Sequence, residues 1–423
     1  MRTALVRAAT IVLAGLLIGA CSDEHRDLLA PHAGPERVVA INRCADLILC
    51  NQVNWVDISA GAGVTCAVHS VSPFLNVQIT TSNLSCWGSN YYGMLGIGTA
   101  TESCVGYLNG TNQTVACSTT PKPVAVAKVF NSVSVGSTHV CAIERGTALA
   151  FCWGSNASGA LGFGNHGVGN FPTPTTAAAG GITFNSIAAG NGQTCGVTTA
   201  QDIVCWGGSF GDAPVLKSNG MDKFQSVTLE LDLSAASVIC GLTTGGTSCN
   251  GSHTPYSLLG QGTTANHFCQ VTSGSVECWG SNSSGQLGTS SSKFTSSSSP
   301  VTVTASVSFQ SVATGELHSC ALSGTDAFCW GHGWDGELGN ETQNSFAAPT
   351  KVESPFGTTL SFTKISTGAE HTCAIANNSL WCWGRNESGQ LGVGSNQTFL
   401  TYPLPPTGKP VMGLAVPAKV SGT

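Results

Sequence analysis

One short pattern recurs along most of this chain. Residues 371–394 read HTCAIANNSLWCWGRNESGQLGVG, and imperfect copies of the second half occupy 85–98, 151–164, 277–288 and 328–339. The first half returns as HVCAI, QTCGV, HSCAL and VTCAV. Repeats that begin about every 40 to 55 residues indicate small units that bury their apolar faces only by stacking on one another. The chain is therefore predicted to be an array of one unit.

Each copy predicts a β-hairpin. Within 371–394, two short runs flank Asn377 and Asn378, which tolerate the positive φ angles of a two-residue turn. Counting three residue pairs back from the turn sets Cys373 opposite Cys382, in a pair that is not hydrogen-bonded. The Cα atoms of such a pair are about 4.5 Å apart, which is within reach of a disulfide.

The same reasoning covers most of the 19 cysteines. The other hairpin pairs expected are Cys320 with Cys329, Cys269 with Cys278, Cys240 with Cys249, Cys195 with Cys205, Cys141 with Cys152, and Cys66 with Cys86. Local pairing then joins Cys104 to Cys117 and Cys44 to Cys50. A zinc site made from these last four is the alternative, but the chain has no Cys-x-x-Cys. So many paired cysteines indicate an oxidising compartment.

The N-terminus predicts export. Arg2 and Arg7 precede an apolar run, residues 8–20, that is too short to span a bilayer, so residues 1–20 are expected to be a signal peptide. The run ends in Ile-Gly-Ala followed by Cys21, which resembles the lipobox of bacterial lipoproteins, where lipid is attached to the cysteine. The alternative is an ordinary secretory signal with a chance cysteine.

These features divide the chain into three parts. After the signal peptide, residues 21–53 are expected to form a lipid-anchored tether with a small disulfide loop, and residues 54–423 the repeat domain. The lipoprotein resemblance implies attachment to a membrane through Cys21, in the cell envelope of a bacterium. Because Ser22 rather than Asp follows the cysteine, it implies the outer membrane, facing either the periplasm or the exterior.

Composition indicates an all-β fold and argues against nucleic acid as a partner. Glycine accounts for 53 residues and charged residues for 9%, against a usual share of about 25%, which suits short strands and tight turns. The formal net charge is -6, and a chain without basic clusters cannot neutralise many phosphates.

Each unit offers about four short antiparallel strands, which is one propeller blade. The predicted fold is a β-propeller of seven four-stranded blades, one of them truncated. The truncation is expected because Cys240 and Cys269 mark successive hairpins only 29 positions apart. Six blades is the alternative.

The repeats resemble those of the regulator of chromosome condensation family. The family pattern G-x-x-H-x-C-A-L followed by C-W-G-x-N-x-x-G-Q-L-G is matched over roughly residues 55–416, most clearly around Cys141, Cys278, Cys320 and Cys373. Residues 205–215 lack the Asn and the Leu-Gly, and Asn250 replaces a Trp. The resemblance implies a seven-bladed propeller. Eukaryotic namesakes are nucleotide exchange factors that bind chromatin, and a secreted bacterial propeller of similar repeats inhibits β-lactamases.

No residue is expected to be catalytic or to bind a cofactor or metal. His139, His267, His318 and His371 each precede a hairpin cysteine by two positions, so a metal-binding ring is conceivable, but bonds within or between blades are the better interpretation. The recurring Trp of each Cys-Trp-Gly is expected to pack between blades. The glycines at 162–167 and 331–336 match G-x-G-x-x-G but open no helix, so they are not dinucleotide sites.

The sequence therefore predicts a monomeric, non-enzymatic binding scaffold for a protein or surface ligand. The alternative is a propeller hydrolase or lyase with a site in the central channel; an exchange factor is less favoured. The loops after each Cys-Trp-Gly are long and lie on one face, where recognition is expected. Four residues in them are candidates for contact with a partner: Tyr91, Tyr92, Trp334 and Asp335. The alternative is that these side chains pack on neighbouring loops.

Overall fold

The computed structural model describes residues 54–422, except 71–81, 109–110, 165–168, 177–180, 218–222, 232–236, 244–245, 250–251, 255–257, 260–266, 291–294, 356 and 397–413. Residues Asn54–Thr423 form one compact unit. The expected signal peptide and tether, with Cys21, Cys44 and Cys50, lie outside the described residues. In the part of the chain that is described, no helix is long and apolar enough to cross a membrane.

The described residues form seven antiparallel sheets, one with five strands and six with four. The first contains β1 (Trp55–Ala60), β2 (Val64–His69), β3 (Leu84–Ser89), β4 (Glu102–Leu108) and β5 (Thr111–Pro123). The second and third contain β6 (Phe130–Val135), β7 (His139–Glu144), β8 (Ala150–Ser155), β9 (Asn170–Thr176), β10 (Phe184–Ala189), β11 (Gln193–Thr198), β12 (Ile203–Gly207) and β13 (Val215–Leu216).

The fourth and fifth sheets contain β14 (Phe224–Leu231), β15 (Ser237–Thr243), β16 (Gly246–Cys249), β17 (Ser252–Thr254), β18 (Leu258–Leu259), β19 (His267–Thr272), β20 (Ser275–Ser281) and β21 (Ser296–Thr302). The sixth and seventh contain β22 (Ser311–Thr314), β23 (His318–Ser323), β24 (Asp326–Gly331), β25 (Phe346–Lys351), β26 (Phe362–Thr367), β27 (His371–Ala376), β28 (Ser379–Gly384) and β29 (Leu414–Lys419). Two 3-10 turns, η4 (Tyr91–Gly93) and η5 (Gly208–Phe210), complete the described elements.

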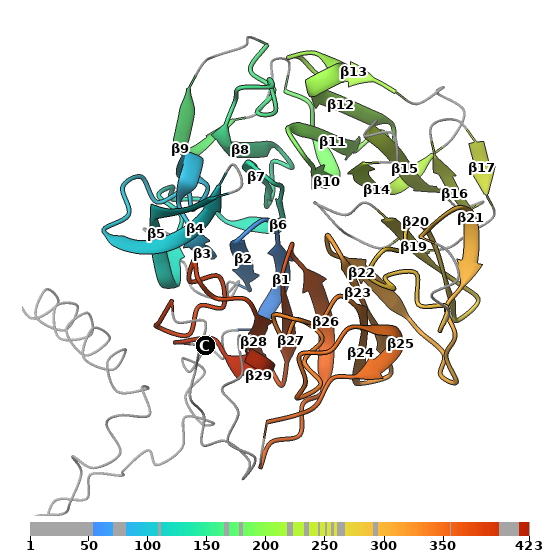
Figure 1. Cartoon of the computed structure of the whole chain (residues 1–423). Helices are drawn as coiled ribbons and strands as arrows, with labels where there is room; N and C mark the ends of the chain where they lie inside the picture. The colour runs from blue at the N-terminus through green and yellow to red at the C-terminus, as the bar shows by residue number, and fades with distance from the viewer. Residues whose placement is uncertain are drawn as a thin grey trace, which may run out of the picture. The chain divides into compact units, whose positions relative to one another are not determined.

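The sheets stand around a common centre as a β-propeller, with strands such as β1, β6, β10, β22 and β26 nearest the middle (Figure 1). Side-chain hydroxyls of the inner strands accept backbone hydrogen bonds from the next sheet. The Ser59 hydroxyl accepts from Val135 N at 3.0 Å, and the Ser366 hydroxyl accepts from Ala60 N at 3.0 Å. Because Ser366 belongs to the last sheet and Ala60 to the first, the second bond joins the two ends of the array.

The all-β propeller expected from the sequence is confirmed, but the prediction of seven four-stranded blades is only partly correct. Six sheets have four strands, whereas the first has five, because the insertion after the first repeat adds β4 beside β5. The sheets on either side of the expected truncation keep four strands by shortening them. Strand β17 has three residues and β18 has two.

The hairpin register follows from the turns. Asn377 and Asn378 have φ angles of 50° and 60°, and Ala376 pairs with Ser379. Because successive strands are antiparallel, the turn between the second and third strands of a sheet lies at one end, here called the turn face. The loops before the second strand and after the third lie at the other end, called the loop face. Those two loops also bond to each other, as in Arg385 N to Glu370 O at 2.9 Å.

Seven disulfides join cysteines among the described residues. Six connect the second and third strands of a sheet with Cα atoms 4.0 to 4.1 Å apart: Cys66–Cys86, Cys141–Cys152, Cys195–Cys205, Cys269–Cys278, Cys320–Cys329 and Cys373–Cys382. Cys104–Cys117 lies in the β4–β5 insertion at 5.8 Å. Cys240 and Cys249 stand opposite each other in the backbone register. The six bridges between second and third strands have the partners expected from the hairpin pattern, and Cys104–Cys117 is the local pair expected in the insertion.

In five sheets a tryptophan packs against the sheet before it. Trp87, Trp153, Trp206, Trp330 and Trp383 are all fully buried. The indole of Trp383 donates to Glu337 O at 2.9 Å, and that of Trp87 donates to Gln390 O at 2.9 Å. These carbonyls belong to the loop of the preceding sheet, so the recurring Trp is a packing residue between sheets.

In four sheets the repeat histidine bonds to the sheet after it. His318 Nε2 lies 2.9 Å from the Thr372 hydroxyl, which donates its own hydrogen to Glu337 O at 2.9 Å. The imidazole must therefore donate through Nε2. Burial lowers the pKa of His318 to about 3, so the ring is neutral at ordinary pH. His139, His267 and His371 make the same bond to Thr194, Ser319 and Thr65. Each histidine thus connects two neighbouring sheets.

Candidate functional site

Trp334 is the most exposed large apolar side chain among the described residues. It lies on the loop face, three residues beyond β24, and 69% of its surface is accessible. Its ring centroid is 5.2 Å from that of His332, at an interplanar angle of 47°. An exposed aromatic on a rigid loop face is the type of side chain that partners contact.

Tyr91 and Tyr92 occupy the matching loop of the first sheet but are packed differently. Both are half-buried, and their ring centroids are 4.1 Å apart. Tyr92 packs against the core cluster that contains Met94 and Leu95, and η4 lies against β8 and β9 of the second sheet. The tyrosines are thus partly used by the fold, whereas Trp334 is not.

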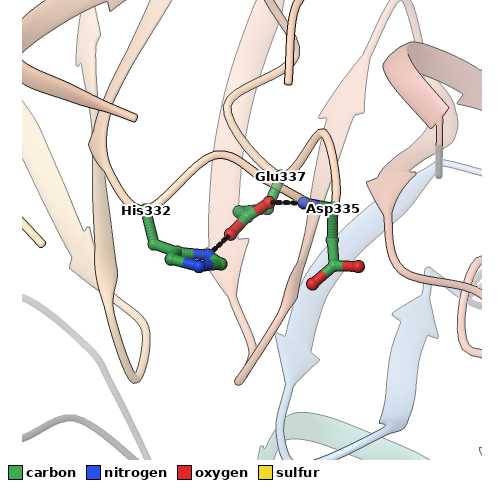
Figure 2. A group of neighbouring side chains, drawn as sticks. All are labelled: His332, Asp335 and Glu337. Atoms are coloured by element: carbon green, nitrogen blue, oxygen red, sulfur yellow. Dashed lines mark hydrogen bonds and ion pairs between the residues drawn. The ribbon is translucent and has the colours of Figure 1, made fainter. Parts of the chain in front are cut away.

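A buried ion pair supports the loop that carries Trp334. Glu337 is 1% exposed, and its two oxygens accept from His332 Nδ1 at 2.5 Å and from Asp335 N at 2.9 Å (Figure 2). In the fifth sheet the corresponding residue is Gln286, which accepts from Ser284 N at 2.8 Å and lies 3.4 Å from the Ser281 hydroxyl. The sixth sheet therefore fills the same position with charged groups.

The Asp335 carboxylate lies in an unusually negative environment. Its pKa is raised to about 6, first by burial and then by the charges of Glu337 and Glu370, against the opposing effect of Arg385 and His332. The hydrogen bond to Glu337 raises the pKa of His332. The Asp335 carboxyl therefore changes charge just below neutral pH.

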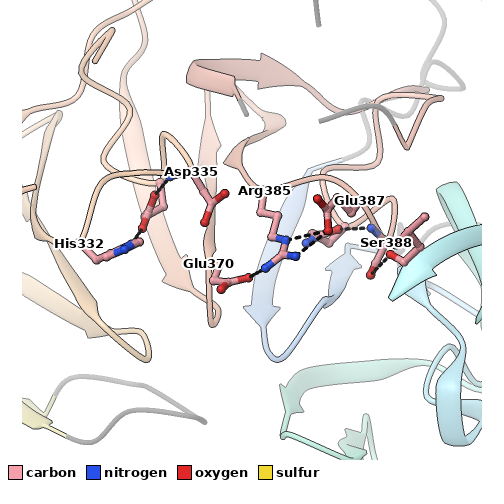
Figure 3. Close-up of polar contacts among 9 residues, drawn as sticks. His332, Asp335, Glu370, Arg385, Glu387 and Ser388 are labelled. Carbon is pink, nitrogen blue, oxygen red and sulfur yellow. Dashed lines mark hydrogen bonds and ion pairs between the residues drawn. The ribbon is translucent and has the colours of Figure 1, made fainter. Parts of the chain in front are cut away.

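Further charged side chains beside this group come from the seventh sheet, where Arg385 is the central one. Its guanidinium bonds to Glu370, and it donates to Glu387 Oε2 at 2.6 Å. Figure 3 shows these side chains in a row along the loop face, from His332 and Asp335 through Glu370 and Arg385 to Glu387 and Ser388. We call His332, Trp334, Asp335, Glu337, Glu370 and Arg385 the Trp334 cluster.

The Trp334 cluster contains three residues that could in principle hold a metal ion. Ligand atoms of His332, Asp335 and Glu337 lie within 4.8 Å of one another. However, Glu337 already uses both oxygens for bonds inside the protein, one of them to His332 Nδ1. A metal would have to break that pair, so the geometry favours an ion pair that positions the loop.

Sequence reasoning found Trp334 and Asp335 but missed His332, Glu337 and Arg385. Their signal is departure from the repeat pattern: His332 and Arg385 stand where three other copies have Ser, and Glu337 stands where the fifth and seventh have Gln. Two or three such departures together would have identified the loop. Glu370 carries no comparable signal, because it lies near Asp335 only when the sixth and seventh sheets are packed together.

Comparisons with known proteins agree with the repeat pattern. Residues 273–322, 326–375 and 377–421 match the model of the Regulator of chromosome condensation (RCC1) repeat, and 362–390 match a second model of the same description. The Ultraviolet-B receptor UVR8 of Arabidopsis thaliana is 27% identical over 352 residues, which are 80% of this chain and 67% of the receptor. The mitochondrial RCC1 domain-containing protein RUG3 of the same plant is 26% identical, over 75% of this chain and 65% of its own.

Two solved yeast structures share the fold. Prp20p from Saccharomyces cerevisiae, whose structure was reported with its binding to Gsp1p and histones, superposes with a TM-score of 0.60 at 18% identity, over 88% of each chain. Yeast RCC1 (Prp20) bound to Kap60 gives a TM-score of 0.62 at 18% identity, over 94% of this chain and 90% of that one. The chain spans about two thirds of the length of the two plant relatives.

Proposed function

Because this chain carries regulator of chromosome condensation (RCC1) repeats folded as a β-propeller, we propose that it is a non-enzymatic binding protein that acts outside the cytoplasm. In this proposal a lipid on Cys21 holds it to a membrane of the bacterial cell envelope, and the loop face contacts a protein partner. Relatives with these repeats are known for interactions, as in the binding of Prp20p to Gsp1p and histones.

The exposure of Trp334 is the observation that carries the proposed binding role. An indole that is 69% accessible contributes nothing to the core, whereas the Cys-Trp-Gly tryptophan of the same sheet, Trp330, is fully buried. Burying a tryptophan at an interface can contribute several kcal/mol to the free energy of binding, which is why Trp is common at binding hot spots.

Export is supported by the disulfides. The hairpin cysteines of six sheets are at most 1% exposed, and each is bonded to the cysteine facing it across the hairpin. Disulfides of this number persist in oxidising compartments and are rare where thiols are kept reduced.

A capture experiment tests the binding role. The chain from residue 22 onward, without lipid, would be immobilised and exposed to envelope proteins of the source cell. We expect Trp334→Ala to reduce capture of the partner about tenfold or more while leaving the melting temperature within about 2 °C, because Trp334 makes no core contact.

The matched control lies on the turn face of the same sheet. Asp326 and Lys351 form an exposed ion pair there, at 2.9 Å. Asp326→Ala with Lys351→Ala should leave capture unchanged. Equal loss of capture in both variants, or no loss in Trp334→Ala, would refute a binding role for the loop face. Tyr92→Ala should lower the melting temperature, because Tyr92 packs on the core.

A propeller hydrolase or lyase is the second candidate, favoured by the Asp335 carboxyl, whose pKa of about 6 suits a general acid or base. The two functions respond differently to Asp335→Asn. A catalytic Asp335 predicts that this variant retains more of the captured ligand than the wild type, because turnover stops. A binding role predicts that it retains less.

A further inference from the structure

The charges around Trp334 do not balance. Asp335, Glu337, Glu370 and Glu387 contribute four carboxylates. Against them stand two basic side chains, His332 bonded to Glu337 and Arg385 bonded to Glu370 and Glu387. Glu370 and Glu387 both bond to that one guanidinium. Another carboxylate of the loop face, Glu316, has its pKa raised by desolvation and by Glu370, which indicates mutual repulsion. The surface beside the exposed indole is therefore net negative.

Asp335 is the carboxylate that the fold leaves unused. Its backbone N–H donates to Glu337, but its side chain accepts no hydrogen bond from any described residue. It is adjacent in sequence to Trp334, on a loop that the buried Glu337 and His332 pair holds in place. A preorganised carboxylate next to an exposed aromatic ring is the arrangement that recognises a cationic group.

We propose that the Trp334 cluster binds an arginine side chain of the protein partner, with its guanidinium stacked on the Trp334 indole and hydrogen-bonded to the Asp335 carboxylate. Arginine suits this surface better than lysine, because its planar group can stack on an indole and donate to carboxylates at the same time. This inference rests on the proposed binding function and specifies the chemistry of its partner.

The test uses labelled pentapeptides as probes. The chain from residue 22 onward is titrated at 150 mM salt with fluorescein-Gly-Arg-Gly-Arg-Gly and with versions in which Lys or Gln replaces Arg, and binding is followed by fluorescence anisotropy. We expect the affinity order Arg, then Lys, then Gln. The double change Trp334→Ser with Asp335→Ser should weaken binding of the Arg peptide about tenfold.

That double change copies a loop the protein already contains. Ser283 and Ser284 occupy the corresponding positions of the fifth sheet, so the variant is expected to fold, which a melting curve checks. A single Asp335→Asn change should weaken the Arg peptide about threefold. Asp326→Asn removes the same charge from the turn face and should change nothing, which separates the site from a general attraction of a cationic peptide to an acidic protein.

A gain-of-function control tests whether the whole cluster is needed. Ser283→Trp with Ser284→Asp places the same pair on the fifth sheet, where Gln286 replaces Glu337. Introduced into the weakened double variant, it should not restore binding, because the supporting carboxylates are absent there.

Several outcomes would overturn the inference. One is equal affinity for the Arg and Gln peptides. Another is an Asp326→Asn effect as large as that of Asp335→Asn, and a third is binding that appears only with added Zn²⁺ or Ca²⁺ and is lost in EDTA. If Trp334→Ala still abolishes protein capture while the peptides show no preference, the binding function stands and its arginine chemistry is wrong.

Discussion

Reduction of the disulfides is expected to unfold the protein at room temperature. A bridge over a loop as short as Cys320 to Cys329 is worth about 2–3 kcal/mol of the free energy of unfolding, since it restricts the unfolded chain. Seven described bridges together exceed the net stability of about 5–15 kcal/mol that is typical of a domain. The array cannot compensate, because each sheet buries its faces only against its neighbours.

Urea denaturation followed by tryptophan fluorescence measures this effect. Removing one bridge with the double change Cys320→Ala and Cys329→Ala should lower the free energy of unfolding by about 2–3 kcal/mol. Full reduction in dithiothreitol with mild urea should abolish the cooperative unfolding transition. Non-reducing peptide mapping identifies the bridges in the starting material. A reduced protein that keeps its near-native melting temperature would show that the bridges add little to the fold.

As the pH is lowered, the free energy of unfolding is expected to fall before ordinary carboxylates become protonated. Burial lowers the pKa of His139 to about 4, and that of His267, His318 and His371 to about 3. The unfolded chain takes up protons near pH 6.5, whereas the folded chain does not. Stability is therefore complete above about pH 6.5 and falls as the pH decreases, by about 2 kcal/mol per histidine at pH 5.

A glutamine substitution isolates this contribution. His318→Gln keeps an N–H donor near the Nε2 position and cannot be protonated, and the third sheet already has Gln193 at the matching place. The variant should be close to the wild type at pH 7.5, and it should lose about 2 kcal/mol less than the wild type between pH 7.5 and pH 5. If the variant and the wild type lose the same free energy of unfolding between pH 7.5 and pH 5, His318 is not a buried neutral donor.

The sequence predicted those parts of the fold that are decided locally. The register of Cys373 and Cys382 depends on one turn, Asn377 and Asn378, whose positive φ angles asparagine tolerates. The fifth strand of the first sheet was missed because β4 pairs with β5 inside an insertion that has no counterpart in the repeat. The 29 positions from Cys240 to Cys269 looked too few for the strands between them. They suffice because β17 has three residues and β18 has two, and strands this short leave no periodic pattern in the sequence.

The candidate site was only half predictable. Trp334 and Asp335 could be found because the second and fifth copies have only Ala or Ser there. Their surroundings could not, because Glu370 comes from the next repeat and reaches Asp335 only once two sheets are packed. Tyr91 and Tyr92 gave the same sequence signal as Trp334, but the second sheet covers part of their surface. The exposure of these aromatic side chains depends on the neighbouring sheet and cannot be predicted from the loop sequence alone.

The location and thiol state of the protein in its own cells test the proposed export most directly. Cells would be quenched in acid, fractionated and labelled with a polyethylene glycol maleimide that shifts any chain with free cysteines on a gel. We expect the wild type in the membrane fraction without a shift, because the proposal places a lipid on Cys21 and pairs the remaining cysteines. Cys21→Ser should be released in soluble form or accumulate unprocessed, and a chain lacking residues 1–20 should stay in the cytoplasm and shift. A wild-type protein found in the cytoplasm with reactive thiols, or a Cys21→Ser protein still bound to the membrane and normally matured, would contradict the lipid-anchored, extracytoplasmic role.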